Sequence, residues 1–418
     1  MMIKPKQAVI FCGGLGTRLR PITYELPKPM VSVMDKPFLE YLLEQLAAQG
    51  VERFLLLTGY MGEVIYEYFG DGSFWGWEIE YSFGPIEWDT GRRLWEVQDN
   101  LDSLFLILYA DNFAQINLNK LMHVHQKEKA SVTLSLAAKK NGNIRISASG
   151  RIEKYIKNRI GDELNLVEIG YMVTERDDIL PLYENIPNTP NISFSKILEI
   201  LVEKEQISGL IVKGDYHSIS DKDRLELMRK YLTPKKIILI DRDGIINVKA
   251  PRGQYIKNCK DFKLIDDTVE SMKKLALDGF CFIVITNQAG ISRGMVSEEN
   301  LIQIHRLMID KLKNEGVTIL DIYICRHHWD DDCDCRKPRA GLFYKIAREH
   351  FLRMDKTLYI GDDVRDCEAA YNAECGIVLV ANSEEYELIK NKPKWNINVD
   401  KLSDAVLDIK SFMGFQET

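Results

Sequence analysis

Two aspartates separated by one residue follow a short apolar run in the second half of the chain. Asp241 and Asp243 come directly after Ile237–Ile240. Phosphoryl transfer to a carboxylate needs one aspartate as nucleophile and a second acid that exchanges a proton with the leaving oxygen. Two carboxylates this close resist joint ionisation unless a cation neutralises them, which indicates Mg²⁺. The pair therefore predicts phosphoryl chemistry through an aspartyl intermediate.

Later positions could hold the phosphoryl group or the cation. Thr286 and Asn287 follow the apolar run 283–285, and their hydroxyl and amide groups can bind a transferring phosphoryl oxygen. Lys337, in the run Cys-Arg-Lys-Pro, can neutralise both that group and the nucleophile. Asp362 follows another apolar run and offers a further carboxylate to Mg²⁺. Together these positions suit an enzyme that removes a phosphate.

Residues 325–335 concentrate three cysteines and two histidines. In a long chain without a secretory signal, crowded cysteines indicate metal ligands rather than disulfides. Thiolates and imidazole at Cys-x-His and Cys-x-Cys spacing can close a tetrahedron around Zn²⁺ with no open position, so the predicted zinc site is structural. We interpret the cysteines without such a pattern as packing residues: Cys259, Cys281, Cys367 and Cys375.

The N-terminal half carries a glycine-rich turn followed by cations. Gly13, Gly14 and Gly16 come after the apolar run 8–11. Glycines at such a turn let the backbone approach a nucleotide, and N–H groups at the start of the following helix attract phosphate. A hydroxyl and two cations come next, namely Thr17, Arg18 and Lys28. Because Arg18 and Lys28 could neutralise a departing pyrophosphate, the pattern predicts a nucleotide site.

Short β-branched runs alternate with amphipathic helical stretches, which indicates βαβ units over mainly parallel sheets. In the N-terminal half we predict a helix over 37–48 and strands over 8–11, 53–58 and 104–109. In the C-terminal half we predict helices over 268–277 and 298–314 and strands over 237–240, 282–286 and 358–360. Pro234 separates a predicted helix, 221–232, from a new strand and marks the boundary. The prediction is two α/β domains, 1–232 and 235–418, each a mainly parallel sheet flanked by helices.

The C-terminal motifs resemble the haloacid dehalogenase superfamily over residues 235–385. Within it, D-R-D-G-I-I-N, T-N-Q-A-G-I-S-R-G and C-R-K-P are similar to the heptose-bisphosphate and histidinol-phosphate phosphatases. The resemblance implies a nucleophile at Asp241, an acid and then base at Asp243, phosphate ligands at Thr286 and Lys337, and substrate contacts at Asn287 and Arg336. Its Mg²⁺ ligands correspond to Asp241, Asp243 and Asp362, and its zinc ligands to Cys325, His327, Cys333 and Cys335 rather than His328. The heptose enzymes generally carry lysine where this chain has Asp363, and the short stretches between motifs leave no large cap domain.

The N-terminal motifs, G-G-x-G-T-R followed by P-K-P-M, resemble the sugar-1-phosphate nucleotidyltransferases over residues 1–232. Among subfamilies the stretch is similar to the heptose-1-phosphate guanylyltransferases. The resemblance implies a Rossmann-like sheet and a Mg²⁺ ligand at Asp111, which follows the predicted strand 104–109.

The chain departs from the nucleotidyltransferase pattern at three places. Ser218 stands where the family has a second metal aspartate, and a hydroxyl is a weaker ligand for Mg²⁺. The usual L-G-T-G-G-A loop is replaced by residues 88–93, in which Arg92 and Arg93 narrow or recharge the pocket. The family's sugar-contacting Glu-Lys pair has become Lys157-Asn158. These departures favour nucleotide binding over turnover as the expectation.

Charge and hydropathy limit the partners and the location of the chain. A formal net charge of −7 and a pI near 5.7 give no basic stripe, which argues against nucleic acid and anionic membranes as partners. No apolar run reaches the roughly 20 residues that cross a bilayer, and residues 1–7 lack the apolar core of a secretory signal. We expect a cytoplasmic enzyme that binds sugar phosphates and a nucleoside triphosphate.

The two resemblances fit consecutive reactions. Removal of the 7-phosphate from D-glycero-D-manno-heptose 1,7-bisphosphate yields heptose 1-phosphate, to which a guanylyltransferase adds GMP. We therefore expect a bifunctional enzyme with Mg²⁺ in both domains and Zn²⁺ in the phosphatase. One alternative is an active phosphatase with a nucleotide-binding or regulatory N-terminal domain, supported by Ser218, Arg92 and Lys157. Another is a histidinol-phosphate phosphatase, which gives the fused domain no role.

Overall fold

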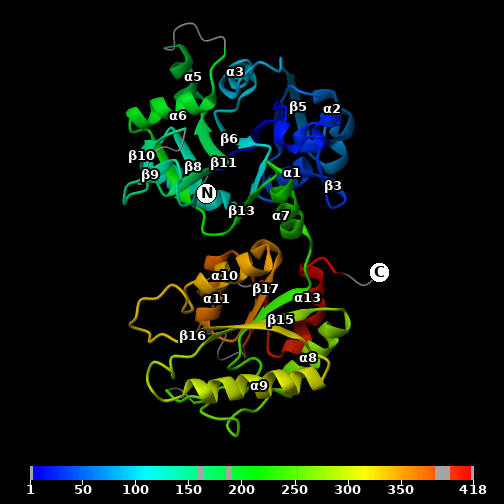
Figure 1. The fold of residues 1–418 in the computed structure, drawn as a ribbon, viewed down its shortest axis with the longest axis vertical. Helices are drawn as coiled ribbons and strands as arrows, with labels where there is room; N and C mark the ends of the chain where they lie inside the picture. The colour runs from blue at the N-terminus through cyan, green and yellow to red at the C-terminus, as the bar shows by residue number, and fades with distance from the viewer. Residues whose placement is uncertain (1–2, 158–163, 185–190, 252, 382–395, 416–418) are drawn as a thin grey trace. The chain divides into compact units, whose positions relative to one another are not determined.

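The computed structural model describes residues 3–157, 164–184, 191–251, 253–381 and 396–415. The chain divides into two compact units, Met1–Thr233 and Pro234–Thr418 (Figure 1). Within the described ranges, no helix is long and apolar enough to cross a membrane.

The N-terminal unit is built on a mixed sheet of nine strands. In chain order they are β1 (Gln7–Phe11), β4 (Arg53–Thr58), β5 (Glu78–Phe83), β6 (Leu104–Tyr109), β8 (Val132–Ala138), β9 (Ile144–Ile146), β10 (Ile152–Tyr155), β11 (Leu166–Glu175) and β12 (Ile207–Ile211). β1 lies between β4 and β6 and is parallel to both, and β5 continues the parallel series beside β4. β11 runs antiparallel to β6 and β8, and so joins the parallel strands to the rest of the sheet.

Helices bury both faces of this sheet. They are α1 (Phe38–Ala47), α2 (Gly62–Phe69), α3 (Thr90–Trp95), α4 (Leu118–Glu128), α5 (Arg176–Glu184), α6 (Phe194–Glu203) and α7 (Lys222–Leu232). Val9 and Phe11 of β1 share a core with Phe194 and Leu198 of α6. Because successive side chains of a strand point to opposite faces, Ile10 is buried on the other side. Burial on both sides explains why the strands appear in the sequence as continuous apolar runs.

Two short ribbons lie beside this sheet. β2 (Ser32–Val33) pairs with β3 (Lys36–Pro37), and β7 (Asn112–Ala114) pairs antiparallel with β13 (Tyr216–Ser218). The second ribbon places Ser218 opposite Asn112, next to the end of β6. It therefore brings the end of the unit's chain back to the segment that carries Asp111.

The C-terminal unit has a six-stranded sheet in the order β16-β15-β14-β17-β18-β19, with every pair parallel. The strands are β14 (Ile237–Ile240), β15 (Cys281–Asn287), β16 (Ile319–Cys325), β17 (Leu358–Gly361), β18 (Gly376–Val380) and β19 (Ile397–Val399). The helices are α8 (Asp266–Leu277), α9 (Glu298–Asn314), α10 (Gly341–His350), α11 (Val364–Ala373) and α13 (Val406–Phe412). Ile238 and Ile240 pack with α8, α9 and α13, whereas Leu239 packs with α10 and α11.

These sheets confirm the predicted fold class of two α/β domains. In the C-terminal unit, parallel strands bring their carboxyl ends to one edge, where ligands of such sheets bind. Asp241 follows β14, Thr286 lies at the end of β15, and Asp362 follows β17. The fold therefore carries these three residues to the same edge.

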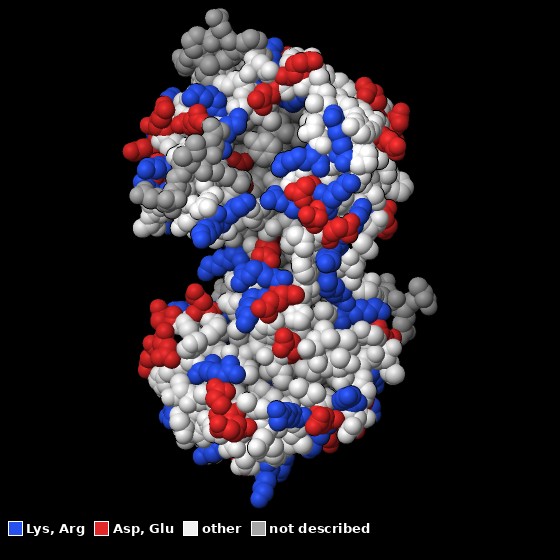
Figure 2. Space-filling view, in the orientation of Figure 1, with Lys and Arg blue, Asp and Glu red and all other residues white. Residues whose placement is uncertain are grey.

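Surface charges of both signs are mixed on the molecule. On the face shown in Figure 2, Lys and Arg side chains are interspersed with Asp and Glu in each unit. Anionic ligands therefore depend on cations gathered locally in cavities, and the expectation that nucleic acid does not bind stays a prediction.

Candidate active sites

The carboxyl edge of the C-terminal sheet opens into a cavity of about 810 Å³. Its lining includes all the residues predicted to serve phosphoryl chemistry: Asp241, Asp243, Thr286, Asn287, Arg336, Lys337 and Asp362. These residues come from separate segments of the chain, which the parallel strands bring together.

Lys337 is a buried cation of this cavity. Its ammonium nitrogen lies 2.9 Å from Oδ1 of Asp241 and 2.7 Å from Oδ1 of Asp366, and it donates to the Tyr359 hydroxyl at 2.6 Å. Burial alone would lower the pKa of Lys337, but the two carboxylates outweigh it and raise that pKa. The lysine therefore stays charged beside Asp241.

Asp243 is held by a separate set of donors. Arg242 donates to its two oxygens at 3.0 and 2.8 Å, Gln288 donates at 2.7 Å and Asn247 at 3.0 Å. Burial favours the neutral acid, but the charge and hydrogen bonds of Arg242 lower the pKa of Asp243 overall. Behind it, Nη1 of the buried Arg242 lies 3.0 Å from Nε2 of His305. Burial and Arg242 lower the pKa of His305 to about 3, so its imidazole is neutral and can accept that hydrogen bond.

The pKa of Asp241 is shifted in the opposite direction to that of Asp243. Carboxylate oxygens of Asp241, Asp362 and Asp366 all lie within 4.8 Å of one another. Burial raises the pKa of Asp241 well above its usual value; Lys337 opposes this shift, and the other two carboxylates add to it. Burial and Asp366 also raise the pKa of Asp362 to about 6, against the effect of Lys249 at 2.8 Å. Three carboxylates crowded at one cavity suit a hard cation such as Mg²⁺.

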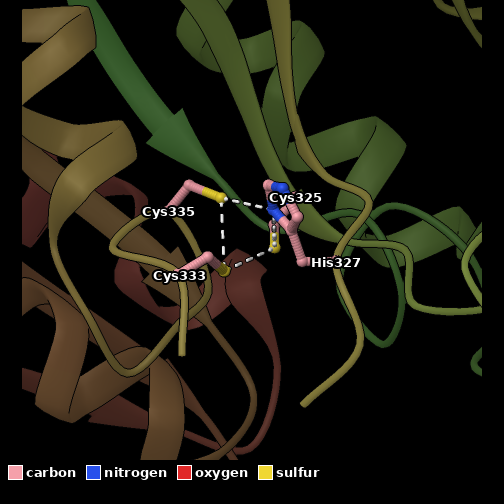
Figure 3. A group of neighbouring side chains, drawn as sticks. All are labelled: Cys325, His327, Cys333 and Cys335. Carbon is pink, nitrogen blue, oxygen red and sulfur yellow. Dashed lines mark hydrogen bonds between the residues drawn. The ribbon is translucent and has the colours of Figure 1, made fainter. Parts of the chain in front are cut away.

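A cluster of soft ligands lies between β16 and α10 (Figure 3). The sulfur of Cys325 is 3.7 Å from that of Cys333 and 3.8 Å from Nδ1 of His327. The sulfur of Cys335 is 3.5 Å from that of Cys333 and 3.1 Å from the same nitrogen. A tetrahedral site with Zn–S bonds of about 2.3 Å has S···S edges of about 3.8 Å. The four predicted residues therefore have the spacing of a zinc site, and His328 is not part of the group.

The N-terminal unit has a cavity of about 360 Å³ at the ends of β1 and β6. Every residue predicted to contact the nucleotide lines it: Gly13, Gly14, Gly16, Thr17, Arg18, Lys28 and Asp111. Nζ of Lys28 lies 2.7 Å from Oδ2 of Asp111, so the cation predicted to neutralise pyrophosphate is beside the carboxylate predicted to hold Mg²⁺. The glycine turn leads into a three-residue 3₁₀ turn, Thr17–Leu19, instead of the helix start that the pattern predicts.

Ser218 and its neighbour Ser220 occupy different settings at the edge of this cavity. Ser218 is buried, its hydroxyl lies 3.0 Å from that of Ser220, and it accepts from Arg224 at 3.3 Å. Ser220 lines the cavity. The position predicted to replace a metal carboxylate is therefore occupied by a hydroxyl that already has two polar neighbours.

The two arginines of residues 88–93 also differ. Arg92 forms an ion pair with Glu96 and does not line the cavity, whereas Arg93 is buried in the cavity wall. Lys157 donates to the hydroxyl of Ser193 at 3.3 Å, and Asn158 lies outside the described residues. Of the two arginines of residues 88–93, Arg93 is therefore the one that adds a positive charge to the cavity wall.

Comparison with known proteins assigns both units. The family model described as nucleotidyl transferase matches residues 7–156, and the model described as polynucleotide kinase 3 phosphatase matches residues 236–374. The D-glycero-beta-D-manno-heptose-1,7-bisphosphate 7-phosphatase of Photorhabdus laumondii is 32% identical over 180 residues, which cover 41% of this chain and 94% of that protein. Through its C-terminal unit, the chain belongs to the heptose-1,7-bisphosphate 7-phosphatase family.

A second relative and a solved structure are named for similar phosphatases. The probable D-glycero-D-manno-heptose-1,7-bisphosphate 7-phosphatase of Thermoplasma volcanium is 38% identical over 127 residues, covering 30% of this chain and 85% of that protein. The crystal structure of D,D-heptose 1.7-bisphosphate phosphatase from B. bronchiseptica, complexed with magnesium and phosphate, has 26% identity and a TM-score of 0.40, and covers 42% of this chain and 98% of that one. The chain is thus an enzyme with a nucleotidyltransferase domain and a heptose-bisphosphatase-family domain.

Asp366 is the phosphatase-unit residue that motif analysis missed. Besides Lys337, it accepts from the hydroxyl of Tyr359 at 2.9 Å, and its Oδ2 accepts from the backbone N–H groups of Asp362 and Asp363 at 3.1 and 3.2 Å. The one available signal was an acid four residues after Asp362, in the first turn of the next helix, where carboxylates commonly cap N–H groups.

Asp243 and Asp363 differ from their predicted surroundings. The carboxylate of Asp243, predicted as a Mg²⁺ ligand, is engaged by Arg242, and the acids grouped with Asp241 are Asp362 and Asp366. Asp363 caps α11 and pairs with Arg365, so its side chain has a structural partner.

Gly244 lies where a side chain does not fit. Its φ is +98°, and a Cβ at this position would overlap the carboxylate of Asp362. We expect Gly244→Ala to displace that carboxylate and to lower phosphatase turnover by roughly 100-fold, because displacements near 1 Å in a site cost about this much. Steady-state phosphate release measures the effect.

Gly316→Ala, outside the cavity, is the matched control for backbone strain. Gly316 has φ +78°, but a Cβ added to it would have no atom within 4 Å apart from its chain neighbours. Both variants carry the cost of a left-handed conformation, roughly 1–2 kcal/mol. An equal loss of turnover in the two variants would show that strain, and not contact with Asp362, limits the residue at 244.

Proposed function

We propose that this chain is a bifunctional enzyme of nucleotide-activated heptose synthesis, with domains over 1–232 and 235–418. The phosphatase removes the 7-phosphate of D-glycero-D-manno-heptose 1,7-bisphosphate, and the nucleotidyltransferase joins GMP from GTP to heptose 1-phosphate. The observation that carries the proposal is the cavity in which Asp241 lies beside Lys337 and Asp362, in a family whose members are named for the phosphatase reaction. The product of that reaction is a sugar 1-phosphate, the substrate implied by the resemblance of the N-terminal motifs to the sugar-1-phosphate nucleotidyltransferases.

In the proposed phosphatase reaction, an oxygen of Asp241 attacks the phosphorus, and the bond from phosphorus to the sugar oxygen breaks. In its protonated form, Asp243 gives the leaving oxygen a proton, and the resulting carboxylate then takes one from the water that hydrolyses the aspartyl phosphate. The charge of Arg242 favours the carboxylate, which performs the second of these steps. Lys337 and Thr286 stabilise charge on the phosphoryl oxygens. The carboxylates grouped around Asp241 fit Mg²⁺, which when bound would offset the charge of the phosphate.

Arg336 and Asn287 have different contacts in the phosphatase cavity. Nη1 of Arg336 is buried and has no hydrogen-bond partner among the described residues, which supports a contact with the sugar or its phosphate. The amide of Asn287 both donates to and accepts from the backbone of Lys337, at 3.1 Å each. We therefore propose that Arg336 binds substrate and that Asn287 positions Lys337.

The N-terminal reaction needs neutralisation of pyrophosphate. An oxygen of heptose 1-phosphate attacks the α-phosphorus of GTP, and the bond to the departing pyrophosphate breaks. Arg18 and Lys28 lie in the cavity that would hold these phosphates, and Asp111, which accepts a hydrogen bond from Lys28, would hold Mg²⁺. Gly14, at which an added Cβ would have open space, lets the backbone approach the nucleotide, whereas Gly13 and Gly16 make room for Arg93 and Lys28.

A phosphatase with a nucleotide-sensing N-terminal domain is the second candidate, and Ser218 in place of a second carboxylate favours it. Pyrophosphate release from the full chain, with heptose 1-phosphate and each common triphosphate, separates the two. We expect release with GTP. No release with any triphosphate that binds would establish the sensing role, and release with CTP alone would refute guanylyl transfer. Faster hydrolysis of histidinol phosphate than of heptose bisphosphate would refute the phosphatase assignment.

Asp111→Ala is expected to weaken binding of Mg²⁺–GTP by roughly tenfold or more, because it removes the proposed metal ligand and the partner of Lys28. Calorimetric titration of the full chain measures the loss. Asp177→Ala, whose side chain is 81% exposed, is the control and should bind as the wild type does. Equal affinities in the two variants would contradict the role of Asp111.

A further inference from the structure

Arg93 is a buried cation in the wall of the nucleotide cavity. Only 3% of the residue is exposed, yet it lines the cavity together with Ile86 and Trp88. Nη1 donates to the carbonyl of Thr58 at 2.5 Å, and Nη2 donates to the carbonyl of Pro85 at 2.7 Å. The guanidinium group is therefore anchored to the ends of β4 and the segment after β5.

Three glycines make the space for this side chain. A Cβ at Gly13 would lie 2.5 Å from Cζ of Arg93, one at Gly59 2.6 Å from Nη2, and one at Gly84 2.9 Å from Nη1. All three distances are shorter than real Cβ atoms show, so glycine is required on three sides of the guanidinium group. The group is consequently held in one place, at the Gly13 end of the glycine turn.

The charge of Arg93 is not paired with a carboxylate. Among the described residues, none forms an ion pair with it, and its hydrogen bonds go to two neutral carbonyls. A guanidinium group carries five N–H donors, so donors remain for a ligand. Burial lowers the pKa of Arg93 and outweighs the effect of Asp89, in the same cavity lining, which favours the charged form. Because a buried charge without an ion pair is unfavourable, acceptor atoms of a ligand in the cavity would stabilise it.

The two ends of the cavity have different chemistry. Lys28, which contacts the opposite end of the glycine turn at Gly16, pairs with Asp111 and suits phosphates and Mg²⁺. The end beside Gly13 has the ring of Trp88 and the donors of Arg93. An aromatic ring and fixed N–H donors suit a planar base with acceptor atoms.

We infer that Arg93 selects guanine, by donating to the adjacent acceptors O6 and N7 on one edge of the base. Guanine presents two acceptors there, whereas adenine presents one acceptor and one amino donor, which a guanidinium group repels. The inference rests on the proposed nucleotidyl transfer and names the base that the site takes. Arg93 thus serves as a specificity-determining residue that touches the nucleotide and lies away from the reacting phosphates.

Base analogues test this contact in the full-length protein. With Mg²⁺ present, we expect inosine triphosphate, which keeps O6 and N7, to bind as GTP does. 7-Deaza-GTP, which lacks only N7, and ATP should each bind roughly tenfold more weakly, the usual discrimination of such a contact. Arg93→Lys should weaken the binding of GTP and inosine triphosphate roughly tenfold. It should change the binding of 7-deaza-GTP and ATP little. Arg53→Lys, at a paired arginine on β4 of the same unit, should leave all four unchanged.

Equal binding of GTP and 7-deaza-GTP to the wild-type protein would overturn the inference, and this measurement does not depend on any variant folding. A parallel loss of all four ligands in Arg93→Lys would also overturn it, since the guanidinium group would then only support the loop. If the wild-type protein binds no triphosphate, the proposed nucleotidyl transfer itself fails.

Discussion

Asp241→Asn is expected to lower phosphatase turnover by roughly 1,000-fold or more, as removal of a nucleophile commonly does. The amide keeps the shape of the side chain but cannot form the aspartyl phosphate. The fold should persist, because Lys337 keeps its contact with Asp366 at 2.7 Å and one of three crowded carboxylates is neutralised. Phosphate release from heptose 1,7-bisphosphate and a thermal melt measure the two effects.

Asp330→Asn is the control for loss of an aspartate in the same unit. Its side chain is 78% exposed, so turnover should stay within about twofold of wild type. A well-folded Asp241→Asn enzyme that keeps more than a few per cent of wild-type turnover would reject Asp241 as the nucleophile.

Cys333→Ser is expected to lose most of the zinc that we propose at the Cys325 cluster, about one ion per chain in the wild type. Since zinc binding contributes directly to folding, the melting temperature of the phosphatase unit should fall. Turnover should fall as well, because Cys335 lies two residues before Lys337. Elemental analysis, a thermal melt and phosphate release give the three readings.

Cys259→Ser is the matched control, since Cys259 is a partly buried cysteine of the same unit outside the cluster. It should keep its zinc. Wild-type protein without zinc, or Cys333→Ser with full zinc content, would reject the site.

Local sequence patterns predict the elements but not how they pair. Strands 53–58, 104–109 and 237–240 and helix 298–314 have the bounds that periodicity predicts. The buried faces of these elements determine which positions are apolar, so the apolar pattern predicts the elements directly. The apolar pattern does not show that β11 is antiparallel to β6, because a buried strand has the same continuous apolar pattern in either direction. The mixed character of the N-terminal sheet therefore appears only in the structure.

In the candidate sites too, some residues can be predicted from the sequence and others appear only in the structure. Motifs single out Asp241, after a strand, and Lys337, in the Cys-Arg-Lys-Pro run, because the chemistry restricts both residue type and position. Asp366 escapes that reasoning, since an acid in the first turn of a helix is common for capping alone. The sequence also does not show which of Arg92 and Arg93 lines the cavity. Adjacent side chains of a helix point about 100° apart, so only one of the two faces the cavity, and the packing of the helix decides which one.

The glycine slot around Arg93 makes four positions interdependent. A methyl group at Gly13, Gly59 or Gly84 collides with the guanidinium group, so each alanine substitution alone should be harmful. At Gly13, whose three nearest atoms all belong to Arg93, the same substitution should become tolerable once position 93 carries a small residue. A Cβ at Gly59 or Gly84 would still meet the backbone oxygen of Gly13 or the ring of Trp88. In a lineage of such chains, arginine here can be gained only after all three glycines are present, and while it remains none of them can change. One side chain therefore constrains the order in which substitutions at these positions can occur, and not only which residues they carry today.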